Sequence, residues 1–148
     1  FRGELGQFFT PRPIVDFMTE LLDPKEGELV CDPAAGSGGF LIRTFEHVRK
    51  KIADDVQARK DKARAEIEAR RLKEDEEVRR IDEVFAKLNR ELDPDQGDPP
   101  SRIRKLARGC IFGTDAEPRA ARTAKMNMIM HGDSTRRVES HSPSRFRL

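Results

Sequence analysis

The chain has 148 residues, enough for one modest domain, with 36% of its residues hydrophobic and 38% charged. Its net charge of +2 excludes a strong overall field for nucleic acid and leaves room only for local basic patches. No apolar run approaches the roughly 20 residues of a membrane span, and no signal-peptide pattern is present. We therefore expect a soluble, cytoplasmic protein without a membrane partner. Because the sequence begins at Phe1, we also expect it to be a piece of a longer protein.

Residues 1–45 predict a loop, a helix, a strand, a glycine-rich turn and the start of a second helix. Thr10 can cap the first helix, and Pro11 suits its first position. The apolar run LVCDPA then has the length of a strand, and AGSGG leads into a helical pattern. Cys31 in this run, and Cys110 in a later one, are expected to be buried, reduced thiols. The apolar positions at helical spacing are Ile14, Val15, Phe17, Met18, Leu21 and Leu22, followed by Phe40, Leu41, Phe45 and Val48.

Residues 46–93 predict a charged helical insertion. The stretch from Glu46 to Leu92 contains no Gly or Pro, and acids repeatedly precede bases by four residues, which stabilises helices. One continuous helix would run about 70 Å at 1.5 Å per residue, more than a small domain can cover. We therefore expect a helical hairpin that turns between Gln57 and Glu77. A solvated spacer is favoured over a specific binding surface, because charge runs are usually surface.

Residues 94–133 predict a second strand, turn and helix. After the loop DPDQGDPPS, the residues Cys110, Ile111 and Phe112 form a buried-strand pattern, and GTDAEP turns into a helix. Two such units indicate a parallel α/β sheet that the hairpin interrupts at a crossover. Residues 134–148 carry four arginines against one glutamate without apolar periodicity, which indicates a disordered tail or an artefact of truncation or of a shifted reading frame. The expected buried side of the last helix holds Ala120, Ala121, Ala124, Met128 and Ile129.

The glycines of DPAAGSGGF follow a strand and precede a helix, where backbone N–H groups can approach a ligand closely. A phosphate-binding loop is excluded, because no Lys-Ser or Lys-Thr follows the glycines. A dinucleotide fingerprint fits poorly, because its third glycine would fall at Leu41 and Asp32 would face a pyrophosphate. Asp32 instead suits a cationic group such as an ammonium. Asp115, at the end of the second strand, suits either ribose hydroxyls or the cap of the next helix.

Three blocks in this order resemble the modification (M) subunit of type I restriction-modification systems, a family of adenine-specific DNA methyltransferases: GQFFTPRPIVDFM, DPAAGSGGFLIRT and GTDAEPRAARTAKMNMIMHGD. The three blocks cover 47 of the 148 residues of the sequence printed above. The resemblance implies a partial class I S-adenosylmethionine-dependent methyltransferase fold, with a Rossmann-like parallel sheet and a long charged helical hairpin insertion. It also implies S-adenosylmethionine as cofactor, and DNA, specificity subunits and restriction subunits as partners.

The resemblance further implies which residues contact the cofactor. The segment Gln-Phe-Phe-Thr-Pro-Arg closes over its methionine end, Asp32 faces its amino group, and Asp115 accepts its ribose hydroxyls. For Arg12 a surface role is the alternative, and for either phenylalanine a core role. His131 is interpreted as a helix-end residue, not a ligand. The implied contacts are Gln7, Phe8, Phe9, Thr10, Pro11, Arg12, Asp32, Ala35, Gly36, Ser37, Gly38, Gly39 and Asp115.

The sequence departs from the family at the catalytic loop. The family holds the flipped adenine with an Asn-Pro-Pro-Phe loop, and no such loop is present in this sequence. The stretch Asp98–Ser101 lacks the aromatic residue and is interpreted as a proline-rich turn. No catalytic residue and no metal ligand is assigned, and the catalytic loop is expected from outside this chain. The alternatives are a non-catalytic protein-interaction module with a relic methyltransferase fold and, ranked last, a nicotinamide oxidoreductase.

Overall fold

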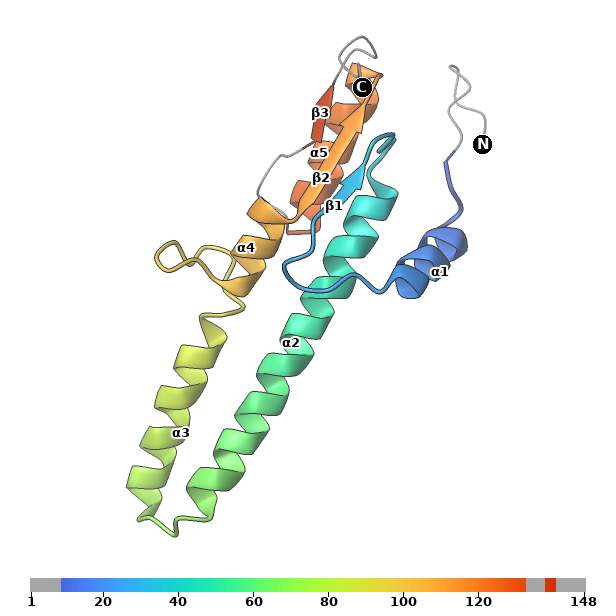
Figure 1. Cartoon of the computed structure of the whole chain (residues 1–148). Helices are drawn as coiled ribbons and strands as arrows, with labels where there is room; N and C mark the ends of the chain where they lie inside the picture. Colours follow the sequence, from blue (N-terminus) through green and yellow to red (C-terminus); the bar gives the residue numbers. More distant parts are fainter. Residues whose placement is uncertain (1–8, 133–137, 141–148) are drawn as a thin grey trace. The chain divides into compact units, whose positions relative to one another are not determined.

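The computed structural model describes residues 9–132 and 138–140 (Figure 1). The described chain divides into two compact units. The sheet unit takes the residues up to Val48 and those from Leu106 onward, and the hairpin unit takes Arg49–Lys105. Within the described residues, no helix is both long and apolar enough to cross a membrane. The elements are α1 (Arg12–Leu22), β1 (Val30–Asp32), α2 (Gly39–Glu68), α3 (Glu74–Asn89), α4 (Arg102–Gly109), β2 (Ile111–Asp115), α5 (Pro118–Met130) and β3 (Val138–Ser140).

The strands of the sheet unit pair in the order β1-β2-β3, and both pairs are parallel. The register aligns Asp32 of β1 with Gly113 of β2, and Asp115 of β2 with Ser140 of β3. Parallel neighbours need a crossover connection, and helices lie between each pair of strands in the chain. The predicted parallel α/β sheet is confirmed, and the carboxyl ends of its strands lie along one edge.

β3 lies in the segment for which the sequence predicts disorder. Val138 aligns with Gly113 and is buried, so these three residues belong to the sheet. A strand of three residues is too short to show apolar periodicity, which is why the pattern does not reveal it. The other residues of the predicted tail, 134–137 and 141–148, lie outside the described part of the chain.

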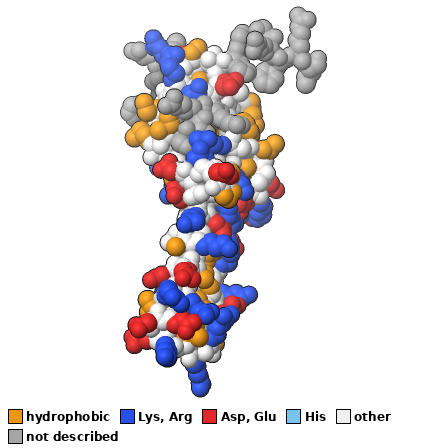
Figure 2. Space-filling view, turned by 90° about the vertical axis from the view of Figure 1, so that its left-hand side faces the viewer, with side chains coloured by type: hydrophobic (Ala, Val, Ile, Leu, Met, Phe, Trp, Pro, Cys, Tyr) orange, Lys and Arg blue, Asp and Glu red, His pale blue; other side chains and the backbone are white. Residues whose placement is uncertain are grey.

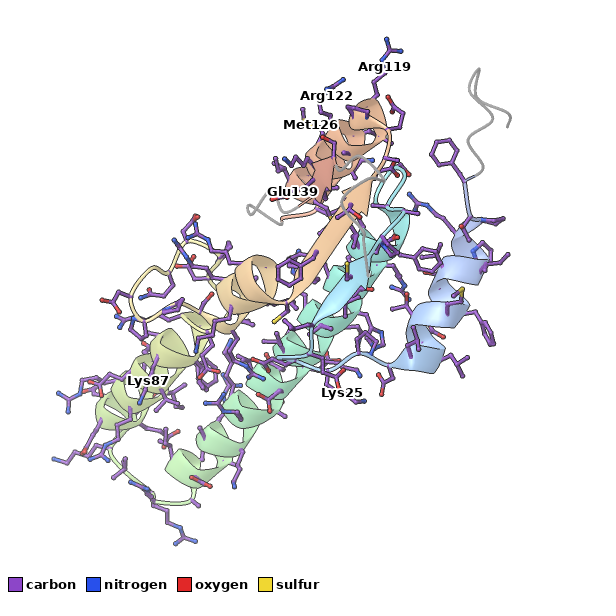
Figure 3. The ribbon with its side chains drawn as sticks, turned by 45° about the horizontal axis from the view of Figure 1, so that its top comes forward. Lys25, Lys87, Arg119, Arg122, Met126 and Glu139 are labelled. Carbon is purple, nitrogen blue, oxygen red and sulfur yellow. The ribbon has the colours of Figure 1, made fainter. Side chains whose placement is uncertain are left out.

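α5 and the start of α2 pack against the sheet (Figure 1). α2 buries Leu41, Phe45 and Val48. Ile129 is 41% exposed, which contradicts the prediction that it shares the buried side of α5. The outer side of α5 carries Arg119, which projects away from the sheet with its neighbour Arg122 (Figure 3). The predicted residues of α5 that are buried are Ala120, Ala121, Ala124 and Met128.

α1 begins at Arg12, one residue later than predicted. Pro11, not Thr10, occupies the position before the helix, and no side chain caps it. The Pro11 carbonyl accepts the first hydrogen bonds of the helix, from the N–H groups of Ile14 at 3.0 Å and Val15 at 3.2 Å. The prediction of a Thr10 cap is therefore wrong. A helix can start in this way because the N–H groups of its first turn have no partner inside the helix in any case.

The hairpin unit consists of two antiparallel helical arms, as predicted. The C-terminal part of α2 and α3 are joined by a turn at residues 69–73, inside the predicted interval. Arg59 donates two hydrogen bonds to Glu91, and Lys60 and Arg64 lie over the ring of Phe85 at 5.5 and 5.1 Å. Figure 2 shows Lys and Arg side chains interspersed with Asp and Glu side chains over this unit, the pattern of a solvated helical surface.

Two further features concern the lengths of the helices. α2 runs for 30 residues, so the predicted boundary at residue 46 lies inside it, whereas the division between the units falls after Val48. α4 forms from RIRKLARG, a stretch for which no helix is predicted, and it buries Ile103, Leu106 and Ala107. The signal for this helix is the helical spacing of these three apolar residues. It is weak because the helix has only eight residues, several of them basic.

The outer edge of β1 carries a groove of about 720 Å³ whose lining is mainly apolar. Met18 and Leu22 of α1, Leu29 before β1, and Leu41 of α2 contribute to its walls. Cys31 lines this groove and is exposed, which contradicts the predicted burial, whereas Cys110 is buried as predicted. The difference arises because β1 is an edge strand of the described sheet.

Candidate functional site

Two carboxylates meet at the glycine turn between β1 and α2. Asp32 is the last residue of β1, and its Oδ1 accepts a hydrogen bond from the Ala34 N–H at 3.0 Å. Asp115 is the last residue of β2, and its Oδ2 accepts one from the Gly36 N–H at 2.8 Å. The two acids are 83 positions apart in the chain, and parallel pairing of β1 with β2 brings them to the same edge.

The charges at this edge repel one another. Burial raises the pKa of Asp32 above its ordinary value of 3.8, and the negative charge of Asp115 raises it further, against the lowering effect of the Ala34 hydrogen bond. In the part of the chain that the structure describes, no cationic side chain pairs with either carboxylate. A cationic ligand group placed beside Asp32 would relieve this repulsion and stabilise the ionised carboxylate.

The glycine turn has a conformation that other residues adopt only with strain. Gly36 and Gly38 have φ angles of +54° and +87°, in the left-handed region. A Cβ at Gly38 would also lie 3.3 Å from the Cα and Cβ of Ala124 in α5. The turn is tied to β2 by the Ala35 N–H, which donates to the Thr114 carbonyl oxygen at 2.9 Å. A rigid turn thus leads directly into the N-terminus of α2, where backbone N–H groups lack helical partners.

The alternative role of Asp115, as the cap of α5, is not the one it has. Glu117 is the N-cap, and its side chain accepts a hydrogen bond from the Ala120 N–H at 2.6 Å. Asp115 lies two residues earlier, where its Oδ1 accepts from the Glu117 N–H at 2.8 Å. Pro118 could have revealed this, because a proline at the first helical position makes the preceding residue the cap.

Two adjoining cavities lie between the glycine turn and the segment that precedes α1. We call the smaller cavity, of about 270 Å³, the inner cavity and the larger one the outer cavity. Phe9, Thr10 and Asp32 are among the residues that line the inner cavity. Arg12 lines the outer cavity, of about 580 Å³, together with Asp16 and Arg43. Both volumes are close to the range of about 300–1,000 Å³ typical of ligand sites. The inner cavity is lined by Phe9, Thr10, Val15, Asp32, Ala34, Ala35, Gly36, Ser37, Gly39 and Phe40.

The remaining predicted contacts lie elsewhere. Pro11, Gly38 and Asp115 line neither of the two cavities, and Asp115 reaches them only through its hydrogen bond to Gly36. Gln7 and Phe8 lie outside the described residues. The structure therefore brings together the beginning of α1, the end of β1 and the glycine turn, with Asp115 behind the turn.

One residue of α5 and one that follows it contact the glycine turn and α2. The Asn127 side-chain amide donates to the Ser37 carbonyl oxygen at 2.9 Å. The sequence does not predict this contact, and the only signal for it is that Asn127 is the one side-chain amide in α5. His131 follows the last residue of α5, as predicted for a helix-end residue, and its Nδ1 lies 2.8 Å from Glu46 Oε1.

Comparison with known proteins places these features in one family. The N-6 DNA methylase family profile matches residues 2–67. The type I restriction enzyme EcoEI methylase subunit of Escherichia coli is 43% identical over 58 residues, which are 39% of this chain and 12% of that protein. The MjaIX methylase subunit of Methanocaldococcus jannaschii is 39% identical over 131 residues, which are 88% of this chain and 14% of that protein.

A solved structure shares the fold. The crystal structure of the type I restriction enzyme EcoKI M protein has a TM-score of 0.57 and 22% identity, covering 91% of this chain and 21% of that one. The observed fold is thus a partial class I methyltransferase fold, with a Rossmann-like parallel sheet and a charged helical hairpin between β1 and β2. The chain spans about a fifth or less of the length of these relatives. The sequence matches support the identification of the chain with the methylase (M) subunits of type I restriction enzymes, and the shared fold agrees with it.

Proposed function

We propose that this chain is the S-adenosylmethionine-binding part of a type I restriction-modification subunit that methylates the exocyclic amine of adenine in DNA. The observation that carries the proposal is the meeting of Asp32 and Asp115 at one glycine turn, at the carboxyl ends of adjacent parallel strands. In open α/β sheets, ligands bind outside the carboxyl ends of the strands. The similarity of the chain to N-6 DNA methylases and type I methylase subunits supports the choice of cofactor.

The residues at the turn fit the chemical groups of S-adenosylmethionine. Asp32 would hold the ammonium, because this carboxylate is half-buried beside another negative charge and the described chain offers it no cationic partner. Phe9 would face the sulfonium, since an aromatic ring attracts a cation. Thr10 and the first N–H groups of α2 would bind the carboxylate. Asp115 would accept the ribose hydroxyls, because each of its oxygens can accept a hydrogen bond beyond the one it has.

Bound S-adenosylmethionine would supply an electrophilic methyl group on its sulfonium. The residues of this chain would bind and orient the cofactor and exclude water from it, and we assign none of them to the transfer step or to a metal. In this proposal, residues 1–45 and 94–133 are two parts of one cofactor-binding domain, and residues 46–93 are an insertion. DNA and the specificity and restriction subunits are proposed partners of the intact complex, in the cytoplasm. The proposed cofactor contacts are Gln7, Phe8, Phe9, Thr10, Pro11, Arg12, Asp32, Ala35, Gly36, Ser37, Gly38, Gly39 and Asp115.

Isothermal titration calorimetry with S-adenosylmethionine tests the proposal. We expect micromolar binding to the chain, and loss of binding in Asp32→Ala and Asp32→Asn. Asp82→Asn, which removes an exposed acid of α3, is the matched control and should bind like the wild type. A folded chain that does not bind the cofactor would contradict the proposal and favour a non-catalytic interaction module.

Loss of binding in Asp32→Asn can be separated from loss of folding. The raised pKa of Asp32 means that folding disfavours its charged form, so its contribution to stability falls as pH rises from 3.8 through the folded-state pKa. At neutral pH the uncharged asparagine avoids the cost of burying a charged carboxylate beside Asp115. Urea unfolding at pH 7 should therefore show Asp32→Asn to be at least as stable as the wild type.

A further inference from the structure

α1 is attached to the rest of the sheet unit by little apolar burial. Val15 is 6% exposed and Thr19 is 3% exposed, but the Thr19 hydroxyl donates to the Val15 carbonyl oxygen within the same helix. Hydrophobic attachment grows with the apolar area removed from water, so the buried side chains of α1 contribute little to it. The large apolar side chains of this helix are 42% to 76% exposed, namely Ile14, Phe17, Met18, Leu21 and Leu22.

Ionic contacts supply the attachment instead. Arg43 of α2 lies between two acids of α1, with its Nε 2.6 Å from Asp16 Oδ1 and its Nη2 3.3 Å from Glu20 Oε1. One turn further along α2, His47 Nε2 lies 2.9 Å from Asp23 Oδ1, just after α1 ends. The three acids are spaced by four and three residues, and Arg43 and His47 by four, so each set lies on one side of its helix. We name these contacts the α1–α2 clasp.

The residues of the clasp follow, along each helix, the residues that line the inner cavity. Phe9 and Thr10, which form one wall, come directly before α1, and Asp16 follows within the first turns of that helix. The glycine turn, which forms the other wall, comes directly before α2, and Arg43 lies one turn after Gly39. Arg43 does not line the inner cavity itself, but lines the outer one beside Asp16. This ion pair therefore connects the helix that follows one wall to the helix that follows the other.

We propose that Arg43 is a positioning residue for the cofactor: through Asp16 and Glu20 it holds α1 so that Phe9 and Thr10 face the glycine turn. This inference rests on the proposed function for its ligand, but the attachment of α1 is measurable without any ligand. Direct binding of the cofactor carboxylate by Arg43 is a competing role. The two roles differ in what Asp16 does. If Arg43 positions α1, Asp16 is needed as its partner, whereas if Arg43 binds the cofactor carboxylate, Asp16 competes with that carboxylate for Arg43.

Hydrogen–deuterium exchange of the α1 amides, without cofactor, tests the attachment. Ion pairs that are partly exposed contribute modestly to stability, so we expect Arg43→Gln, which loses two pairs, to speed exchange in α1 by about three- to tenfold. Asp16→Asn should have a smaller effect in the same direction, and 1 M salt should bring the wild type close to Arg43→Gln, because screening then acts within about 3 Å. Lys50→Gln removes an exposed pair with Asp54 elsewhere on α2 and is the matched control. Unchanged exchange in Arg43→Gln would overturn the inference.

Calorimetry with S-adenosylmethionine tests the positioning. We expect Arg43→Gln and Asp16→Asn to weaken affinity in the same order as they speed exchange, and the reversed set Asp16→Lys, Glu20→Lys and Arg43→Glu to restore both. Weaker binding in Arg43→Gln but equal or tighter binding in Asp16→Asn would show that Arg43 contacts the cofactor, which overturns the positioning role. A wild type that binds no cofactor defeats the proposed function and the positioning role together, whereas the exchange result still decides whether Arg43 holds α1. Circular dichroism confirms that each variant is folded.

Discussion

Asp115 joins three parts of the sheet unit through its backbone hydrogen bonds. Its two oxygens accept from the Gly36 N–H in the glycine turn and from the Glu117 N–H at the start of α5, while its own backbone ends β2. A carboxylate that accepts N–H groups is a stronger acceptor than a neutral group. The same side chain therefore fixes the turn, and leaves Glu117 to cap the following helix.

Gly113 shows how closely α2 approaches the sheet. A Cβ at this position would lie 2.5 Å from Leu41 Cδ1, closer than side chains can pack. We expect Gly113→Ala to lower the free energy of unfolding by about 1–3 kcal/mol, the usual cost of overpacking a core. Urea unfolding measures this. Gly109→Ala is the control, because a Cβ at Gly109 has no neighbour within 4 Å, and it should leave stability unchanged or higher. Equal stability of both variants would contradict the tight contact.

Individual side chains were predictable where local chemistry decides them, and not where distant neighbours do. Asp32 and Asp115 were placed at strand ends from short apolar runs and the turns that follow, and the structure has them there. Burial of Cys31 was not predictable, because exposure depends on whether another strand covers β1. The contacts of Arg43 have no signal at all in local spacing, because its partners lie more than 20 positions earlier in the chain.

Among the described elements, α1 carries the most exposed large apolar side chains. Its side chains Phe17, Leu21 and Leu22 are 64%, 71% and 76% exposed, and Leu29 nearby is 74% exposed. Large contiguous apolar patches are rare on isolated soluble proteins and promote association. The helical period was predicted correctly from the spacing of these residues. Which side of the helix is covered is not predictable from this spacing, because the buried side holds Val15 and Thr19 while the larger apolar side chains stay exposed.

We expect the exposed apolar side of α1 to make the isolated chain associate. The double variant Leu21→Gln, Leu22→Gln should reduce association and the binding of a hydrophobic dye, with a change in unfolding free energy within about 0.5 kcal/mol, because both side chains are exposed. Analytical ultracentrifugation and dye fluorescence measure these. Val15→Ala, at a buried position of the same helix, should instead lower stability without reducing association. Association that persists unchanged in the double variant would place its cause elsewhere.

The hairpin unit should lose stability in acid. Hydrogen bonding to Arg59 lowers the pKa of Glu91 below its ordinary value of 4.5, and hydrogen bonding to Arg102 lowers the pKa of Asp55 below 3.8. Because both folded-state pKa values are lowered, the stability that these pairs contribute is present above about pH 4.5. It is lost as pH falls through the folded-state values.

Denaturation of the helices, followed by circular dichroism between pH 2 and 6, measures this dependence. Glu91→Gln should be less stable than the wild type at pH 6, and the difference should shrink towards pH 2. Glu83→Gln, at an exposed position of α3, is the control and should follow the wild type. A difference between Glu91→Gln and the wild type that stays constant with pH would contradict the assigned ion pairs.

For the whole molecule, two compact units predict two unfolding events. The sheet unit has long-range parallel pairing. The two arms of the hairpin unit are held together by a few buried apolar side chains, among them Val56 and Leu88, and by exposed ion pairs. Units with separate cores can open separately. The hairpin and the parallel sheet were both predictable from the spacing of apolar and charged residues and from the Gly and Pro residues between the elements. β3 and α4 were not, because three and eight residues are too few to establish a pattern.

The cofactor should stabilise only one of these two units against unfolding. At a concentration 100 times its dissociation constant, S-adenosylmethionine should raise the unfolding free energy of the sheet unit by about 2.7 kcal/mol, and leave that of the hairpin unit unchanged. Hydrogen–deuterium exchange resolved by peptide measures both units in one sample. Equal stabilisation of α3 and β2 would show that the chain unfolds as one cooperative unit.

The hydrogen bond from Gly36 to Asp115 spans 79 positions, so this contact closes a long loop of chain. Loop closure costs entropy that grows with the logarithm of loop length, and non-local contacts of this kind slow folding. The hairpin lies within that loop. Once Arg59 pairs with Glu91, the residues between them are folded, so the flexible part of the loop is shorter. During synthesis the hairpin can form as soon as α3 has emerged, before β2 exists. An insertion that resembles a passive spacer would then act as a folding aid, and shortening or loosening it would slow assembly of the site more than it weakens the finished fold.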